Sequence, residues 1–197
     1  MIKSCIFVGD RDIFNMKKII VLVLLGICLS PIANAQKVVI LKPWQTSVNI
    51  AGGANYQGVG GQIALDARVN ISDFGLVAAL SYDSKNIEID SYMGKNDGKY
   101  SGVTAEISGY YSLYRLLFPA PIDIKPYIGF VYAMESVKKP DNSSDKNNGI
   151  GNSFGVTFQY YVSSSISLLV KQSGYYIYNT PFGELRGSTL LGVNILL

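Results

Sequence analysis

The sequence predicts an all-β fold, namely an eight-stranded antiparallel up-and-down transmembrane β-barrel. Three observations predict it. Apolar and small polar residues alternate in segment after segment, the connections alternate between short and long, and only 16% of the residues are charged, against roughly 25% in soluble domains. No segment after residue 35 has the long apolar run of a transmembrane helix, so we expect strands to cross the membrane.

The N-terminal segment is expected to be removed on export. From Met16 a basic start, an apolar run and Pro31 lead to an Ala-x-Ala cleavage site, with signal-cleavage residues Ala33, Ala35 and Gln36. The apolar run is too short to span a bilayer as an anchor. A lipoprotein is the other alternative, but Ile27 is too bulky for the small residue needed before Cys28. We therefore expect an upstream extension at 1–15, a signal peptide at 16–35, an N-terminal periplasmic segment at 36–46 and the barrel at 47–197.

Residues 59–71 show the alternation most clearly, because successive side chains of a strand point to opposite faces. One face carries Ile63, Leu65, Ala67, Val69 and Ile71. The other carries Gln62, Ala64, Asp66, Arg68 and Asn70.

Seven further segments complete the predicted barrel. The eight expected strands are 47–57, 59–71, 75–91, 99–115, 124–137, 153–162, 165–178 and 187–197. One face of the fourth carries Val103, Ile107 and Tyr111, and one face of the fifth carries Ile128, Phe130, Tyr132 and Met134. The alternation is less regular in the third and seventh strands, and nothing after the leader predicts a helix.

The connections predict the orientation of the barrel. Those after the second, fourth and sixth strands are tight, whereas those after the third, fifth and seventh are polar or rich in glycine and proline, including 94–98 and the run from Pro140 to Asn152. Outer-membrane barrels have short periplasmic turns and longer outer loops, so both mature termini are expected in the periplasm. The Pro140 run holds Asp141 and Asp145, which could gather Ca²⁺, but its spacing matches no EF-hand, and a solvated surface loop is the expectation.

Twelve tyrosines are expected to form two aromatic girdles at the membrane interfaces. The alternative is that tyrosine simply favours strands. The predicted girdle residues are Tyr56, Tyr82, Tyr100, Tyr110, Tyr111, Tyr114, Tyr127, Tyr160, Tyr161, Tyr175, Tyr176 and Tyr178.

A soluble barrel with its apolar face inward would show the same alternation. Residue size separates the two cases, because a water-facing strand normally carries long Lys, Glu and Arg side chains, whereas an eight-stranded lumen has room mostly for small ones. The polar faces here are Ala, Gly, Ser, Thr, Asn and Gln with a few isolated charges. The sequence therefore favours lipid outside.

The isolated charges need partners inside, since an unpaired buried charge is costly. We expect an internal ion-pair network formed by Asp66, Arg68, Glu106, Glu135 and Lys171. A proton or ion path is the alternative, but eight strands leave no wide channel.

Several classes of chemistry are excluded. The chain has no histidine, and its cysteines, Cys5 and Cys28, both lie in the expected leader. Ser-His-Asp and Cys-His nucleophiles and the usual zinc ligand sets are therefore missing, so we expect no enzyme, no metal and no cofactor. The 17 basic and 14 acidic residues fall to 13 and 12 once residues 1–35 are removed, which predicts no nucleic-acid partner.

The whole mature chain resembles the small outer-membrane barrel superfamily that includes OmpA and OmpX, and Gln36 after Asn-Ala resembles exported proteins of the Bacteroidetes. Three segments resemble the TraO family of conjugative-transposon proteins: Gly102–Tyr111, Phe154–Phe158 with 161–164, and Leu191–Ile195. The resemblance implies a place in a mating apparatus. The terminal Leu197 departs from the terminal aromatic of ordinary barrels.

Three functions follow as hypotheses. The first is a structural or assembly role in the outer membrane, in conjugative transfer, with outer-membrane lipid, the barrel assembly machinery and conjugation-apparatus proteins as partners. The second is surface adhesion or binding through loops 83–98 and 138–152. The third is a narrow ion pore.

Overall fold

The computed structural model of the 197-residue chain describes residues 44–55, 58–69, 73–91, 94–117, 120–139, 143–178, 180 and 185–197. The predicted upstream extension, signal peptide and cleavage residues Ala33, Ala35 and Gln36 lie outside these ranges, as does Tyr56. Within them, no helix is long and apolar enough to cross a membrane.

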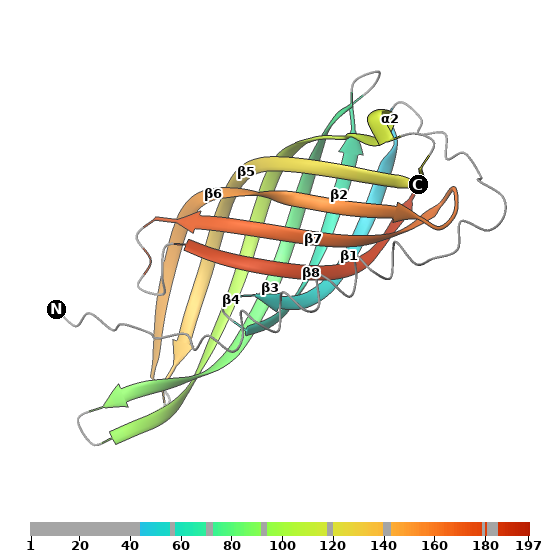
Figure 1. The fold of residues 1–197 in the computed structure, drawn as a ribbon. Coiled ribbons are helices and arrows are strands. Elements are labelled where there is room, and N and C mark those ends of the chain that lie inside the picture. The colour runs from blue at the N-terminus through green and yellow to red at the C-terminus, as the bar shows by residue number, and fades with distance from the viewer. Residues whose placement is uncertain are drawn as a thin grey trace. The chain divides into compact units, whose positions relative to one another are not determined.

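Eight strands form one closed antiparallel barrel, which confirms the predicted fold (Figure 1). Each strand pairs with the next along the chain, and β1 closes the barrel against β8. The strands are β1 Thr46–Asn55, β2 Gly58–Arg68, β3 Phe74–Ser91, β4 Gly94–Tyr111, β5 Ile122–Lys138, β6 Ser144–Tyr161, β7 Ile166–Ile177 and β8 Leu185–Leu196.

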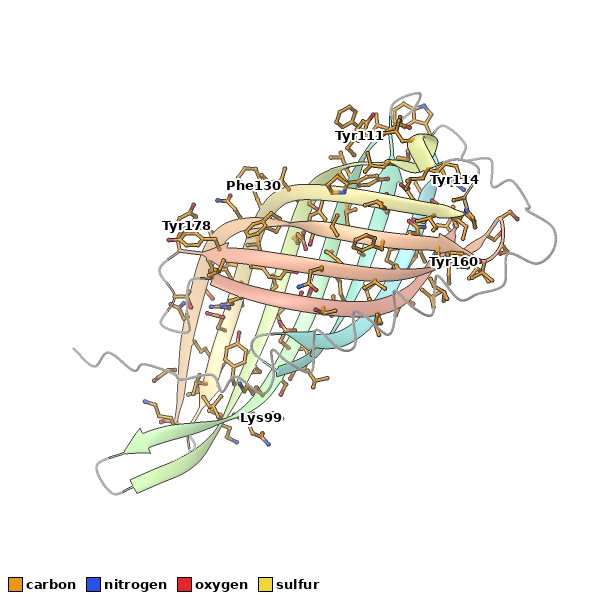
Figure 2. The ribbon with its side chains drawn as sticks, in the orientation of Figure 1. Lys99, Tyr111, Tyr114, Phe130, Tyr160 and Tyr178 are labelled. Carbon is orange, nitrogen blue, oxygen red and sulfur yellow. The ribbon has the colours of Figure 1, made fainter. Side chains whose placement is uncertain are left out.

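The wall of the barrel separates apolar from polar side chains as the alternation predicts. In β2 the burial switches at every residue, so Ile63 and Leu65 are exposed outside whereas Gln62, Ala64 and Asp66 are buried inside. The same alternation holds along β5, and Figure 2 shows Phe130 on the outer side of the wall. The outer surface of the barrel is therefore largely apolar and its interior polar.

Two hairpins extend farther than the sequence predicts. β4 begins at Gly94 and β6 at Ser144, so the expected loop 94–98 and most of the expected loop from Pro140 to Asn152 are strand, and those two predictions are wrong. The first residues of β4 and of β6 are polar on both faces, so the alternation that marks the rest of each strand is missing there. Backbone pairing nevertheless continues to Ser91↔Gly94 and Lys138↔Ser144.

These extensions make one end of the barrel uneven. The β1–β2 and β7–β8 pairings stop at Asn55↔Gly58 and Tyr176↔Leu185, whereas β3 to β6 continue beyond that level (Figure 1). We call this the hairpin end and the opposite end the turn end. The sequence predicts tight connections at the turn end, and this is wrong between β4 and β5, where residues 112–121 form the connection.

A short helix, α2 Tyr114–Leu117, lies at the turn end. The sequence predicts strand to residue 115 and no helix, and both predictions are wrong. β4 ends at Tyr111, and the carbonyl of Leu113 accepts from the amides of Leu116 and Leu117. This single turn satisfies backbone groups that have no neighbouring strand to pair with.

Candidate functional site

The interior of the barrel is the candidate site, because it gathers buried charges that a stable protein must neutralise. Eight ionisable side chains among the described residues are buried acids and bases. They are Asp66, Arg68, Glu106, Asp123, Lys125, Glu135, Lys171 and Arg186. They form successive levels between the turn end and the hairpin end.

The level at the turn end joins an ion pair to a hydrogen-bonded carboxylate. Arg68 Nη2 donates to Asp73 Oδ1 at 2.8 Å, and the hydroxyl of Ser112 lies 2.8 Å from both carboxylate oxygens of Asp123. Burial raises the pKa of the nearby Tyr114 hydroxyl above its ordinary value, and the charge of Asp123 adds to that shift. Tyr114 therefore stays neutral and protonated at physiological pH.

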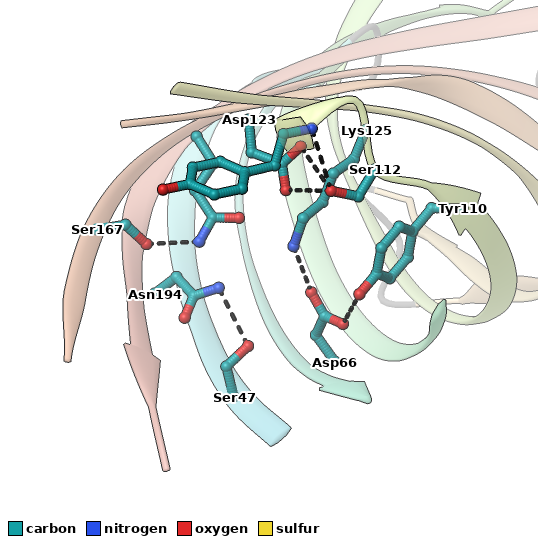
Figure 3. Close-up of polar contacts among 10 residues, drawn as sticks. Ser47, Asp66, Tyr110, Ser112, Asp123, Lys125, Ser167 and Asn194 are labelled. Carbon is teal, nitrogen blue, oxygen red and sulfur yellow. Dashed lines mark hydrogen bonds and ion pairs between the residues drawn. The ribbon is translucent and has the colours of Figure 1, made fainter. Parts of the chain in front are cut away.

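The second level is centred on Asp66 (Figure 3). Its two carboxylate oxygens accept separately, one from Lys125 Nζ at 2.9 Å and the other from the Tyr110 hydroxyl at 2.6 Å. The Lys125 ammonium also lies 4.7 Å from the centroid of the Tyr110 ring. These contacts join β2, β4 and β5 across the lumen and leave the buried carboxylate fully paired.

The third level is centred on Lys171 of β7. Its ammonium donates to Glu106 Oε2 at 3.0 Å and to Gln62 Oε1 at 3.1 Å, and lies 4.8 Å from the centroid of the Tyr127 ring. Gln62 in turn donates from Nε2 to Ser81 at 2.9 Å. One lysine therefore connects strands on opposite sides of the barrel.

The level at the hairpin end is centred on Glu135. Its Oε1 accepts from Arg186 Nη1 and from the Tyr100 hydroxyl, the latter at 2.8 Å. Its Oε2 accepts from Thr180 at 2.7 Å, and Arg186 Nη2 donates to the same threonine oxygen at 2.8 Å. Thr180 lies between β7 and β8 in the sequence, so this level joins that residue to β5 and β8.

The structure places all five charges of the predicted network inside the barrel, but the partners of three lie outside the predicted set. Arg68 pairs with Asp73, Asp66 with Lys125 and Glu135 with Arg186. A sequence signal exists for Lys125, because it shares the strand face of Glu135. Asp73 falls in an expected turn, and Arg186 comes just before the expected eighth strand.

The girdle prediction is wrong for half of its tyrosines, which are at least partly buried on the lumen side. Alternation forbids neighbours such as Tyr110 and Tyr111 from sharing a face. The hydroxyls of Tyr100, Tyr110 and Tyr127 each donate to a polar partner that lipid does not offer. The inward residues are Tyr100, Tyr110, Tyr114, Tyr127, Tyr161 and Tyr175. The predicted girdle residues that are exposed or half-exposed on the outside are Tyr82, Tyr111, Tyr160, Tyr176 and Tyr178.

Small cavities remain among the described lumen residues, and two of them have a volume of about 30 Å³ each. That volume holds a water molecule or two. One is lined by residues of the second and third levels, including Asp66, Lys125 and Lys171, and the other by Arg186 and its neighbours. In the described part of the chain, no three His, Cys, Asp or Glu side chains gather as a metal site would require. The interior of the barrel therefore pairs buried acids with buried bases.

Comparison with known proteins identifies the fold. No family model matches the sequence, and no curated protein sequence matches it significantly. Solved structures do match. A major outer membrane protein from Thermus thermophilus is 15% identical with a TM-score of 0.65, and the alignment covers 78% of this chain and 99% of that one.

Two other small barrels show the same likeness. Neisserial surface protein A is 16% identical with a TM-score of 0.52, over 77% of this chain and 94% of that one. Ail, the attachment invasion locus protein of Yersinia pestis, in a complex with the heparin analogue sucrose octasulfate, is 10% identical with a TM-score of 0.52, over 78% and 97%. The chain therefore has the fold of small outer-membrane barrels.

Proposed function

We propose that this protein is an integral outer-membrane barrel that serves a structural or binding role and conducts no ions. The single observation that supports it is the distribution of side chains, which is the reverse of that in a soluble protein: apolar side chains lie outside and charged ones inside. Ile128 is 71% and Phe130 76% exposed on the outer face, while Glu106 and Lys171 form an ion pair inside. Soluble monomers rarely expose such a continuous apolar surface, and lipid is the solvent that suits it.

The hairpin end faces the outside of the cell and the turn end faces the periplasm in this proposal. Outer-membrane barrels place their longer connections outside, and β3–β4 and β5–β6 are the hairpins that extend here. Both ends of the barrel chain, at β1 and β8, then lie in the periplasm. Outer-membrane lipid and the barrel assembly machinery are the partners that this placement requires.

The experiment is folding of the protein into phosphatidylcholine vesicles, followed by gel electrophoresis with and without heating. We expect a folded band whose migration changes on heating, and detergent-dependent solubility. A monomer that stays monodisperse in plain buffer would overturn the membrane proposal. Planar-bilayer recordings test the second half, because a reproducible unit conductance would favour the narrow pore instead.

Surface binding is a second candidate, favoured by the extended hairpins. β3–β4 and β5–β6 continue beyond the last residue pairs of β1–β2 and β7–β8, and so would present polar strands to the surroundings of the cell. Replacing residues 86–99 by a two-residue Asn-Gly turn should abolish attachment of expressing cells to a surface that they otherwise bind. Unchanged attachment would remove this candidate.

We also propose a role in conjugative transfer as part of a mating apparatus. It is supported only by the likeness of Gly102–Tyr111, Phe154–Phe158 and Leu191–Ile195 to TraO-type sequences. Deleting the gene from its mobile element and measuring transfer frequency tests it. A frequency equal to that of the intact element would contradict the proposal.

A further inference from the structure

Three lysines lie side by side on the outer face of the barrel at its hairpin end. Lys99 of β4 and Lys138 of β5 are direct cross-strand partners. Lys146 of β6 pairs with Ser136, two residues before Lys138 on the same face. We call Lys99, Lys138 and Lys146 the basic row; Figure 2 shows Lys99 near the base of the projecting hairpin.

The three side chains of the basic row carry charge of the same sign. Like charges directly opposite each other destabilise a pair of strands. None of the three lysines has an ion-pair partner among the side chains that the structure describes, which exclude those of residues 88–97, whereas the neighbouring Lys139 pairs with Asp145 at 2.8 Å. All three side chains are exposed.

Among the charged side chains whose exposure the structure describes, those that are exposed all lie at this end, and most are positive. The exposed charged side chains are Lys85, Lys99, Lys138, Asp145 and Lys146. The acids Asp66, Glu106 and Glu135 are instead buried inside the barrel. By register, Asp97 lies opposite Glu88, two residues beyond Lys99 toward the tip of the β3–β4 hairpin, so the basic row occupies a narrow level.

That level lies just beyond the apolar band. Along β4 the outward residues run from Val103 through Ser101 to Lys99, and along β5 from Met134 through Ser136 to Lys138. Four residues of a strand extend about 13 Å, or about 9 Å along the membrane normal at a tilt near 45°. This places the ammonium groups at the level of the lipid headgroups.

We propose that the basic row binds the phosphate groups of a phosphorylated glycolipid in the outer leaflet. Ammonium groups beside hydroxyls suit a phosphate monoester, because they offer charge and hydrogen bonds together. Acyl chains of the same lipid would lie along the apolar wall below, next to Val103 and Met134. The inference rests on the proposed placement of the hairpin end outside the cell.

The test is equilibrium binding of bis-phosphorylated lipid A to the folded full chain in a zwitterionic detergent. Changing all three lysines (Lys99→Gln, Lys138→Gln, Lys146→Gln) should weaken binding by at least about tenfold, because each basic residue near an anionic lipid surface contributes to affinity. Lys138→Gln alone should weaken it less, and binding should fall with added salt.

Lys85→Gln is the matched control. Lys85 is also exposed at the hairpin end, but it lies on the lumen face of β3 and not on the outer face of the barrel. It should bind lipid A like the unmodified protein. Lipid A without phosphates should lose the difference between the proteins, and inorganic phosphate should not compete at concentrations equal to the lipid. Equal lipid A binding by the triple variant, or full competition by inorganic phosphate, would overturn the inference.

Heat-dependent gel migration of the protein folded into vesicles tests the membrane placement separately from the lipid site. A protein that folds into vesicles but binds lipid A independently of the three lysines refutes only the lipid site. A protein that never inserts refutes the membrane placement and the lipid site together.

Discussion

Lys125 Nζ lies 2.9 Å from Oδ2 of Asp66, although 59 positions separate the two residues in the chain. β2 and β5 are not neighbours in the sheet, so this ion pair crosses the lumen. Both side chains are buried, and burying either charge without the other would be costly.

Removing one partner of this pair should be strongly destabilising. We expect Lys125→Met to lower the free energy of unfolding by about 3–5 kcal/mol, because it leaves the Asp66 carboxylate buried without its cation. The double change Asp66→Asn with Lys125→Met should recover part of that loss. Urea unfolding in vesicles measures both, and additive losses would show that the pair is not coupled.

Tyr110 and Tyr111 offer a comparison between adjacent residues. Tyr110→Phe removes the hydroxyl that donates to Asp66 at 2.6 Å, and we expect a loss of about 1–3 kcal/mol because the acceptor is charged and buried. Tyr111→Phe changes an exposed ring that packs against Phe74 outside and should alter stability by less than about 0.5 kcal/mol. Similar losses at both positions would contradict the assigned faces.

The two faces of β2 can be tested directly. Leu65→Arg places a charge on the outer face, where Leu65 is 61% exposed, and should cost about 2–4 kcal/mol if that face meets the middle of the bilayer. Ala64→Ser, on the buried lumen face, should cost far less. The same urea titration in vesicles compares them, and the reverse order would mean that the faces are exchanged.

A side chain at Gly58 should destabilise the barrel. It begins β2 with a φ of 134°, a conformation that residues with a Cβ rarely adopt, and an added Cβ would meet the carbonyl of Ser84. We expect Gly58→Ala to cost about 1–3 kcal/mol. Gly61→Ala is the control, since its nearest neighbour would be the carbonyl oxygen of Ala51 at 3.5 Å. Thermal unfolding in detergent distinguishes the two.

Much of this fold could be predicted because a barrel wall has a two-residue period that the sequence shows. Alternation identified the faces of β2 and β5 and the inward direction of Glu106 and Lys171. Alternation could not predict where β4 and β6 begin at the hairpin end, because both faces of these first residues are polar. It could not give the partners Lys125 and Arg186 either, since contacts across a lumen depend on how eight registers combine.

The ion pairs inside the barrel have a consequence for how it forms. Asp66–Lys125, Glu106–Lys171 and Glu135–Arg186 each join two strands that are not neighbours in the sheet. A flat or partly curled sheet holds these charges far apart, and they stay hydrated until β1 meets β8. We therefore expect the barrel to close and its interior charges to lose their water in one cooperative step. Forms in which β1 and β8 are not yet paired are disfavoured as a result.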